Sequence, residues 1–380
     1  MTLKISHLVS VALFAATFAA CSDDEGPAPV PSDTVSVTPT AETVPVKGNK
    51  DAADDPAIWV NPDDPEQSLI IGTDKKNGLV VYDLSGAIVY QNADGRMNNV
   101  DVRSGYPITT DNGNPDTATP TIIVAATNRT SKTIAVYAMN PNTGALSDIM
   151  VDPIPSNMED PYGLCLYRSA VNGKLYVYAN DKDGTVSQWQ LYDNGLGQLR
   201  YTIQRIWSVG SQPEGCVADD ANGVVYIGEE GKGIWRYGAE PKDSFNERTS
   251  VDKTGLGNAS GGHLAADVEG LALYAPPAAA PDVGYLIASS QGNHTYVVYD
   301  RAVPHAYRGT FQIVDNSSGD VDGVQETDGL DVVSAPLGSD YPAGLLVVQD
   351  GDNKTVDGSD ANQNFKYVSW ADVAEALGLE

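Results

Sequence analysis

The chain of 380 residues carries 51 acidic side chains against 23 lysines and arginines, a formal net charge of -28, and the acids are spread along its whole length. Such a surface repels nucleic acid, so we exclude nucleic acid as a partner. Acidity alone would suit a soluble exported protein, but carboxylates that lie close together need protons or bridging cations, and hard oxygen ligands suit calcium.

The N-terminal residues predict an export signal. Lys4 precedes an apolar run over residues 8–20, which is too short to anchor the chain in a bilayer. The run ends in Phe-Ala-Ala-Cys, which resembles the lipobox of bacterial lipoproteins, in which the cysteine becomes the lipidated first residue. Ser22 follows Cys21, and the absence of Asp there favours the outer membrane. We therefore expect residues 1–20 to be a lipoprotein signal peptide, and the protein to be exported and held at the membrane only by its lipid, on the periplasmic or surface face.

The next segment differs in composition from the rest of the chain. Residues 21–40 are rich in Pro, Ser, Thr and acids, which predicts a flexible tether, and residues 41–380 form the folded domain. Two further cysteines, Cys165 and Cys216, lie in that domain. An exported protein could join them in a disulfide or bury both as free thiols, and the sequence favours neither.

A motif recurs six times in this domain. Each copy opens with a segment such as DDPAIWV or DVEGLALY and continues into apolar strands such as LIIGTDKKNGLVVYDLSG or YLIASSQGNHTYVVYDR. Alternating apolar residues, Val, Ile and Tyr enrichment, and Gly, Asn and Asp turns predict β-strands, with one short helix over residues 370–377. Six such units predict an all-β, six-bladed β-propeller, because a sandwich or barrel does not explain the recurrence. The common points of the six copies are Pro56, Val100, Gly163, Gly215, Gly270 and Gly329.

Polar residues introduce the first strand of nearly every copy. Equivalent positions of successive blades lie on a ring, so we expect these side chains to converge at one end of the propeller axis. Any single one is more simply explained as a turn residue, but six in register favour a site for several calcium ions. These polar residues are Asp51, Asp54, Asp55, Asn98, Asn99, Glu159, Asp160, Glu214, Asp267, Glu269, Glu326 and Asp328.

A second set of polar residues follows the next strand of each copy. The first three copies supply cations and the later copies supply acids or amides, an asymmetry that suits a phosphate group held jointly by cationic side chains and calcium. The Lys75–Lys76 pair alone would be explained as an exposed hairpin. The set comprises Lys75, Lys76, Asn128, Arg129, Asp181, Lys182, Glu229, Glu230, Gln291, Asn293, Asp350 and Asp352.

Motifs for a protein nucleophile are absent from the sequence. None of the four histidines lies in an Arg-His-Gly motif or a zinc-binding pair, and the chain contains neither a P-loop nor a Gly-x-Ser-x-Gly elbow. Water activated by metal ions is therefore the expected attacking group.

Several motifs, in order, resemble those of the β-propeller phytases. They include DAADDPAIWVNP, NNVDVR, YIGEEGKGIWRY, DVEGLALY, TDGLDV and NQNFKYVSW, and the resemblance covers most of residues 41–375. It implies a 3-phytase, a calcium-dependent phosphomonoesterase that binds several Ca²⁺ ions and removes phosphates from phytate, myo-inositol hexakisphosphate, or from its calcium complex. It also implies the six-bladed fold, and we expect a monomer.

The resemblance assigns roles to individual residues. Those implied to contact substrate phosphates are Lys75, Lys76, Arg129, Tyr162 and Lys182. Those implied to hold catalytic calcium and position the attacking water are Asp54, Glu214, Glu230 and Glu269, with Asp267 close by. Those implied to serve structural calcium sites are Glu42, Asp51, Asp55, Asn98 and the carbonyl of Val100. Asp328 is implied to ligate an ion near the axis.

Two other functions stay open at this stage. A calcium-dependent propeller hydrolase of another class, such as a lactonase, would share the acids but would not need Lys75, Arg129 and Lys182 to converge. A non-enzymatic propeller could bind carbohydrate or protein at the cell surface. The fold does not distinguish these functions.

Overall fold

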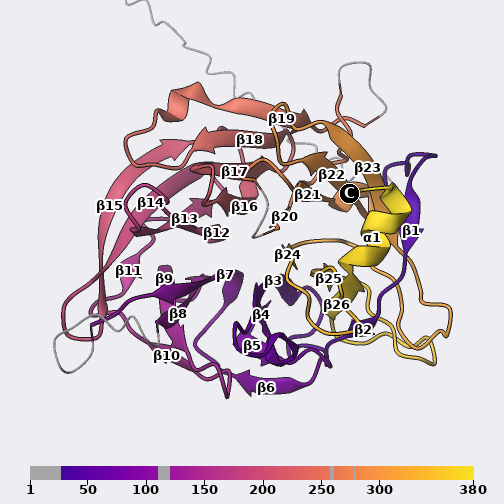
Figure 1. Cartoon of the computed structure of the whole chain (residues 1–380), viewed down its shortest axis with the longest axis horizontal. Helices are drawn as coiled ribbons and strands as arrows, with labels where there is room; N and C mark the ends of the chain where they lie inside the picture. Colours follow the sequence, from indigo (N-terminus) through magenta and orange to yellow (C-terminus); the bar gives the residue numbers. More distant parts are fainter. Residues whose placement is uncertain (1–26, 110–119, 257–260, 277–279) are drawn as a thin grey trace, which may run out of the picture.

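The computed structural model describes residues 27–109, 120–256, 261–276 and 280–380. Six sheets, antiparallel apart from one added N-terminal strand, are arranged in a ring around a common axis (Figure 1). The predicted six-bladed β-propeller is therefore confirmed. Each blade runs from an inner strand beside the axis to an outer strand at the rim, and we number the blades 1 to 6 by the order of their inner strands.

Blades 1 and 2 follow one another along the chain. Blade 1 contains β3 (Ala53–Trp59), β4 (Leu69–Asp74), β5 (Gly78–Tyr82) and β6 (Ile88–Gln91), with the 3-10 turn η1 (Pro65–Gln67) before β4. Blade 2 contains β7 (Met97–Tyr106), β8 (Thr121–Asn128), β9 (Thr133–Met139) and β10 (Leu146–Asp148), and β11 (Ile154–Pro155) pairs with β9.

Blades 3 and 4 repeat the four-stranded pattern. Blade 3 contains β12 (Pro161–Arg168), β13 (Leu175–Asp181), β14 (Thr185–Asp193) and β15 (Leu199–Ser208). Blade 4 contains β16 (Pro213–Asp219), β17 (Val224–Glu229), β18 (Gly233–Gly238) and β19 (Thr249–Lys253), with η2 (Phe245–Glu247) before β19.

Blades 5 and 6 each take one strand from the N-terminal part of the chain. Blade 5 contains β20 (Leu271–Tyr274), β21 (Tyr285–Ser290), β22 (Thr295–Asp300), β23 (Tyr307–Ile313) and β1 (Val35–Val37), with η3 (Gln291–Asn293) after β21. Blade 6 contains β24 (Leu330–Val333), β25 (Leu345–Asp350), β26 (Asn364–Ser369) and β2 (Ala41–Glu42), and the predicted helix α1 (Trp370–Leu377) follows it. The ring is thus closed without a covalent bond, by the pairing of β2 with β26.

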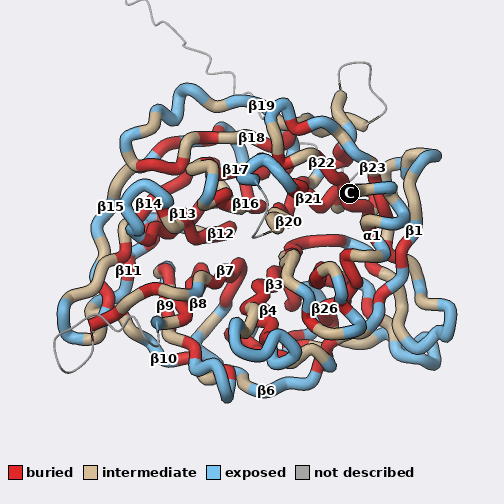
Figure 2. Tube along the Cα trace, viewed as in Figure 1, coloured by how far each residue is buried: buried red, intermediate tan, exposed pale blue. Residues whose placement is uncertain are grey.

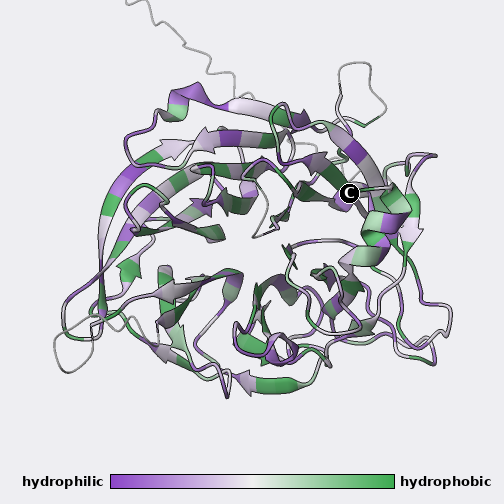
Figure 3. Ribbon diagram, viewed as in Figure 1, coloured by the Kyte–Doolittle hydropathy of each residue, from purple (hydrophilic) through white to green (hydrophobic). Residues whose placement is uncertain are grey.

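The core consists of the layers between neighbouring blades. Second strands such as β4, β13 and β25 are buried along their whole length, because each lies between two other blades. Their sequences accordingly begin with unbroken apolar runs, whereas most outer strands mix hydrophobic and hydrophilic residues (Figure 3). Figure 2 shows buried residues on the inner strands and exposed residues at the rim.

The structure corrects the expected length of the tether. The flexible tether was expected to reach residue 40, but Val35–Val37 form β1, which pairs in parallel with β23. Val37 is buried there and Val35 packs against the same cluster, so two β-branched residues two positions apart supply the apolar face of a strand. The backbone N–H of Ala28 also donates to the carbonyl of Gly292 at 2.6 Å.

The export signal and Cys21 lie outside the described residues. Among the helices that the structure describes, none is long and apolar enough to cross a bilayer.

One disulfide joins two blades. Cys165 on β12 and Cys216 on β16 are bonded, which links the inner strands of blades 3 and 4 across 51 residues of chain. Of the two alternatives that the sequence left open, the structure contains the disulfide. Such a bond stabilises a fold mainly by restricting the unfolded chain.

We expect loss of this disulfide to lower the free energy of unfolding by about 2 to 4 kcal/mol, because the loop it closes is long. Thermal denaturation with and without reductant measures the effect. The Cys165→Ser/Cys216→Ser variant is the control, since its melting should not respond to reductant. Equal melting temperatures for the oxidised protein and this variant would show that the disulfide contributes nothing.

Candidate active site

The inner strands of blades 1 to 4 begin with the same irregularity. In blade 1, Ala53 pairs with Asp74 and Pro56 pairs with Gly72. Between these two pairs β3 therefore has one residue more than β4. The same extra residue occurs at the start of β7, β12 and β16. This is a β-bulge, which turns a side chain out of the regular alternation. In these four blades the bulge therefore turns one residue of the inner strand out of the alternation and toward the axis.

The strand registers define which residues are equivalent in the six blades. The residue turned toward the axis is Asp54, Asn98, Tyr162, Glu214, Glu269 or Asp328 in blades 1 to 6, and we call these six residues the inner ring. The predicted common points Pro56 and Val100 are each one residue too late. Asp55 and Asn99 take the place that glycine takes in the other four copies, and the missing glycine hid the correct alignment.

Seven of the twelve polar residues predicted to introduce the first strands lie outside the inner ring, and two of them, Glu159 and Glu326, face solvent. Glu159 is 94% exposed and forms an ion pair with Lys132, and Glu326 is exposed. Tyr162 occupies the place of an acid in blade 3. The converging set predicted from turn acids is therefore wrong at these positions.

Polar side chains on the second strands bind the bulges. Thr73 accepts a hydrogen bond from the backbone N–H of Asp55 at 2.9 Å, and Asn180 accepts one from Gly163 at 2.8 Å. Thr127, Ser289 and Gln349 occupy the same place on β8, β21 and β25 and accept from Asn99, Gly270 and Asp328. Each bond satisfies a buried backbone N–H at the start of an inner strand. In five blades, therefore, a hydrogen bond from the backbone to the second strand fixes the chain at or next to the inner-ring residue.

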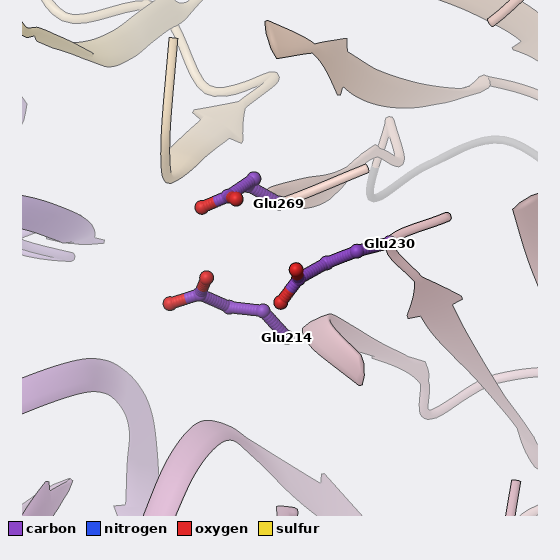
Figure 4. A group of neighbouring side chains, drawn as sticks. All are labelled: Glu214, Glu230 and Glu269. Carbon is purple, nitrogen blue, oxygen red and sulfur yellow. The ribbon is translucent and has the colours of Figure 1, made fainter. Parts of the chain in front are cut away.

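Three glutamates converge beside the axis. One carboxylate oxygen from each of Glu214, Glu230 and Glu269 lies within 4.8 Å of the others, and all three residues are buried. Figure 4 shows their carboxylates directed into a common space. Asn98 links this group to blade 1, because its amide donates to Glu214 at 2.7 Å and to Asp54 at 2.8 Å.

Burial and mutual repulsion make these carboxylates hard to ionise. Burial and the neighbouring Glu269 raise the pKa of Glu230 to about 8. Burial, Asp54 and Glu269 raise the pKa of Glu214 well above its usual value. The Oε2 atom of Glu214 accepts no hydrogen bond from the residues that the structure describes. Buried oxygen donors in need of positive charge match the preference of calcium, so the site fits this ion.

Cations surround the glutamates on the side of blades 1 to 3. Lys75, Arg129 and Lys182 each directly follow the second strand of their blade, the position that Glu230 takes in blade 4 and Gln291 in blade 5. Lys75 Nζ lies 2.8 Å from Asp54 Oδ1 and 3.4 Å from Asp328 Oδ2. Burial opposes its charge, but Asp54, Asp328 and Glu214 outweigh burial and raise the pKa of Lys75.

Tyr162 links the other two cations. The ammonium of Lys182 lies 4.0 Å from the centre of its ring, and the guanidinium of Arg129 lies 5.7 Å from it. Both distances allow a cation–π interaction. The predicted asymmetry is present: cations follow the second strands of blades 1 to 3, and the glutamate cluster comes from blades 4 and 5.

The model of the Phytase family matches residues 2–380. The chain belongs to this family. It is 42% identical over 346 residues to the 3-phytase of Bacillus subtilis (strain 168), and the match covers 90% of this chain and 85% of that protein. The resemblance stated from the motifs is thereby confirmed.

Solved structures resemble the fold at low sequence identity. A luciferin-regenerating enzyme superimposes with a TM-score of 0.54 at 12% identity, covering 87% of this chain and 95% of its own. The calcium-binding protein regucalcin from Agrobacterium tumefaciens gives 0.52 at 10% identity, covering 88% and 97%. At such identities these likenesses support the propeller fold alone.

The remaining residues predicted for this phytase-family site occupy several places. Asp267 precedes the inner ring in blade 5, and burial raises its pKa. Asp51 is exposed and forms an ion pair with Lys75 at 2.5 Å. Asp55 accepts a hydrogen bond from the N–H of Val100 at 3.0 Å, so these two residues, both predicted to serve structural calcium sites, are neighbours. Lys76 is exposed, and its ammonium donates to the carbonyl of Asn49.

Glu42 belongs to a second polar cluster in blade 6. It contacts the ammonium of Lys366, which is fully buried. The same ammonium meets Asp322, Asp350 at 3.3 Å and Asn353 at 2.9 Å. The sequence analysis did not identify Lys366, because a lysine inside the strand FKY gives no signal of burial.

Two further residues touch the site: Gln212, which the sequence analysis did not identify, and Asp160, which it named among the converging polar residues without a role of its own. Gln212 Nε2 lies 2.8 and 2.9 Å from the two carboxylate oxygens of Glu230. Asp160 binds Arg129 through both of its carboxylate oxygens. Gln212 stands two residues before Glu214, and Asp160 two before Tyr162, so both precede the bulge by the same distance. The repeat could have identified this position once its register was corrected.

Proposed function

We propose that this chain hydrolyses phosphate monoesters of phytate in a calcium-dependent reaction, yielding inorganic phosphate and lower inositol phosphates. Family membership and the identity to a 3-phytase support the substrate class. The geometry that carries the proposal is the meeting of three cations from blades 1 to 3 with three buried glutamates from blades 4 and 5.

The cations would bind the substrate. Arg129 offers planar N–H donors and Lys182 a mobile point charge, and both suit phosphate oxygens. Lys75 is held by carboxylates, and a phosphate group would replace them as its partner. A substrate with several phosphates could contact more than one cation at once. The residues proposed to contact phosphates are Lys75, Lys76, Arg129, Tyr162 and Lys182.

The carboxylates would hold calcium and orient the attacking water. Bound calcium supplies positive charge that offsets the phosphate and favours loss of a proton from water. Water would attack phosphorus, the bond to the inositol oxygen would break, and the cationic side chains would stabilise the phosphate oxygens as charge shifts to them. The catalytic group is Asp54, Glu214, Glu230 and Glu269, and further proposed ligands are Glu42, Asp51, Asp55, Asn98, Val100, Asp267 and Asp328.

The competing functions explain less of this geometry. A lactonase would need the carboxylates but not the three cations, and a binding propeller would have no need of buried glutamates that resist ionisation. Converging Lys75, Arg129 and Lys182 therefore favour a phosphorylated substrate over both.

We expect phosphate release from phytate with added calcium and none with excess chelator, measured by a colorimetric phosphate assay from neutral to alkaline pH. Glu214→Gln should lower the rate about a hundredfold or more, because it removes a charge at the reacting centre. Lys75→Met should lower it too, whereas a lactonase would tolerate that change.

The matched control for these variants is Glu375→Gln, an exposed glutamate on α1, which should match the wild-type rate. Absence of calcium-dependent release at every pH tested would refute the proposed function.

Calcium should also raise the melting temperature of the protein, independently of turnover. An ion that binds only the folded state stabilises it, by about 2.7 kcal/mol at a hundred times its dissociation constant. Differential scanning calorimetry with calcium and with chelator measures this effect. Glu230→Gln should respond less than Glu375→Gln. Identical melting curves with and without calcium would rule out the assigned ion sites.

We propose further that the phytase domain is an outer-membrane lipoprotein, with residues 1–20 as its signal peptide and the lipid on Cys21. The motif before Cys21 supports this proposal. Labelled fatty acid should enter the wild-type protein in the producing bacterium, and Cys21→Ser should be unlabelled and absent from the membrane fraction. Equal labelling of the two proteins would contradict the anchor.

A further inference from the structure

Arg129 is held in one orientation by its neighbours. Its Nε donates to Asp160 Oδ1 at 2.7 Å and its Nη2 to Asp160 Oδ2 at 2.9 Å, so the carboxylate binds one edge of the guanidinium bidentately. Its Nη1 donates to Asn98 Oδ1 at 3.0 Å. Because the Asn98 amide also donates to Asp54 and Glu214, the orientation of Arg129 is tied to the inner ring.

Two N–H donors of Arg129 are used by neither Asp160 nor Asn98. A guanidinium has five N–H groups, of which Nε carries one and each terminal nitrogen carries two. The contacts with Asp160 and Asn98 use three of them. One N–H is left on each terminal nitrogen, and guanidinium N–H groups suit the oxygens of a phosphate.

We propose that Asp160 is a positioning residue that fixes Arg129 so that its free edge can receive a substrate phosphate. This inference rests on the proposed function. Asp160 does not touch the reacting atoms: it acts through Arg129, and its carboxylate accepts no other hydrogen bond from the described residues.

Removing the charge of Asp160 would distinguish a positioning role from a purely electrostatic effect on the substrate. A carboxylate beside a phosphate site repels the substrate, so removing its charge would tighten binding if field effects alone mattered. Positioning predicts the opposite, because an unrestrained arginine must lose side-chain freedom when the phosphate binds. The side chain of Arg129 is 15% exposed and that of Asp160 is 39% exposed, so the pair forms part of the wall of the site.

The neighbouring acid provides a matched control. Glu159 precedes Asp160 in the chain and also pairs with a cation, Lys132, but both of these side chains are at least half exposed. Glu159→Gln and Asp160→Asn each remove one charge and keep the shape of the side chain. A general effect of net charge would therefore appear in both variants.

The experiment is a double-mutant cycle with phytate in saturating calcium. The proteins are wild type, Asp160→Asn, Glu159→Gln, Arg129→Ala and Arg129→Ala/Asp160→Asn. Loss of a charge-assisted hydrogen bond predicts that Asp160→Asn raises KM about tenfold, with a smaller change in kcat. Glu159→Gln should stay close to wild type, and Asp160→Asn should add no further change when Arg129 is already alanine.

A structural role of Asp160 would give a different pattern. In that case Asp160→Asn would lower the melting temperature below that of Glu159→Gln and would cost the same factor with or without Arg129. Either that pattern, or a KM at or below the wild-type value, would overturn the proposal. If the wild-type protein released no phosphate, the proposed function would fail by itself, and the same cycle measured as phytate affinity by calorimetry would still decide the role of Asp160.

Discussion

The site depends on one local feature, the bulge at the start of the inner strands of blades 1 to 4. A regular strand would alternate its side chains between the two faces of a blade, both of which are packed against neighbours. The extra residue turns one side chain out of that packing and toward the axis. The backbone N–H of the next residue then donates to a side-chain oxygen of the second strand, as Asp55 does to Thr73 and Gly163 to Asn180. The side chain at each position of the inner ring can therefore differ from blade to blade, while the blades keep a common backbone.

The acids that lie at and beside the inner ring repel one another. Glu214, Glu230 and Glu269 lie closer together than ionised carboxylates tolerate without a counter-ion, and burial adds to the cost. The fold carries this cost because strand pairing and six inter-blade cores stabilise it elsewhere. On the opposite side, Lys75 relieves part of the repulsion through its contacts with Asp54 and Asp328. A bound metal cation could therefore replace Lys75 as the partner of Asp54 and Asp328, and a substrate phosphate could replace these carboxylates as the partner of Lys75.

The sequence predicted the blades well because the apolar runs are long and the motif repeats six times. It also predicted Lys75, Arg129 and Lys182 correctly as equivalent, since each directly follows a strong strand signal. It failed where the signal was local turn chemistry: Glu159 resembles the other acids in sequence but faces solvent. It missed Lys366 and Gln212, whose importance comes from partners far apart in the chain and from burial, which no short motif encodes.

The geometry also links stability to function through the closure of the ring. The ring closes in blade 6, where β2 pairs with β26 and then continues along the chain into blade 1. At the seam between blades 6 and 1, the N–H of Gly329 also donates to the carbonyl of Asp54 at 3.0 Å. This seam carries Asp54, Asp328 and Lys75, one side of the candidate site. The disulfide between blades 3 and 4 lies across the ring from it, next to Tyr162 and Glu214. Opening the seam would separate Asp54 from Asp328, so a ligand that binds across the inner ring must also hold the ring closed.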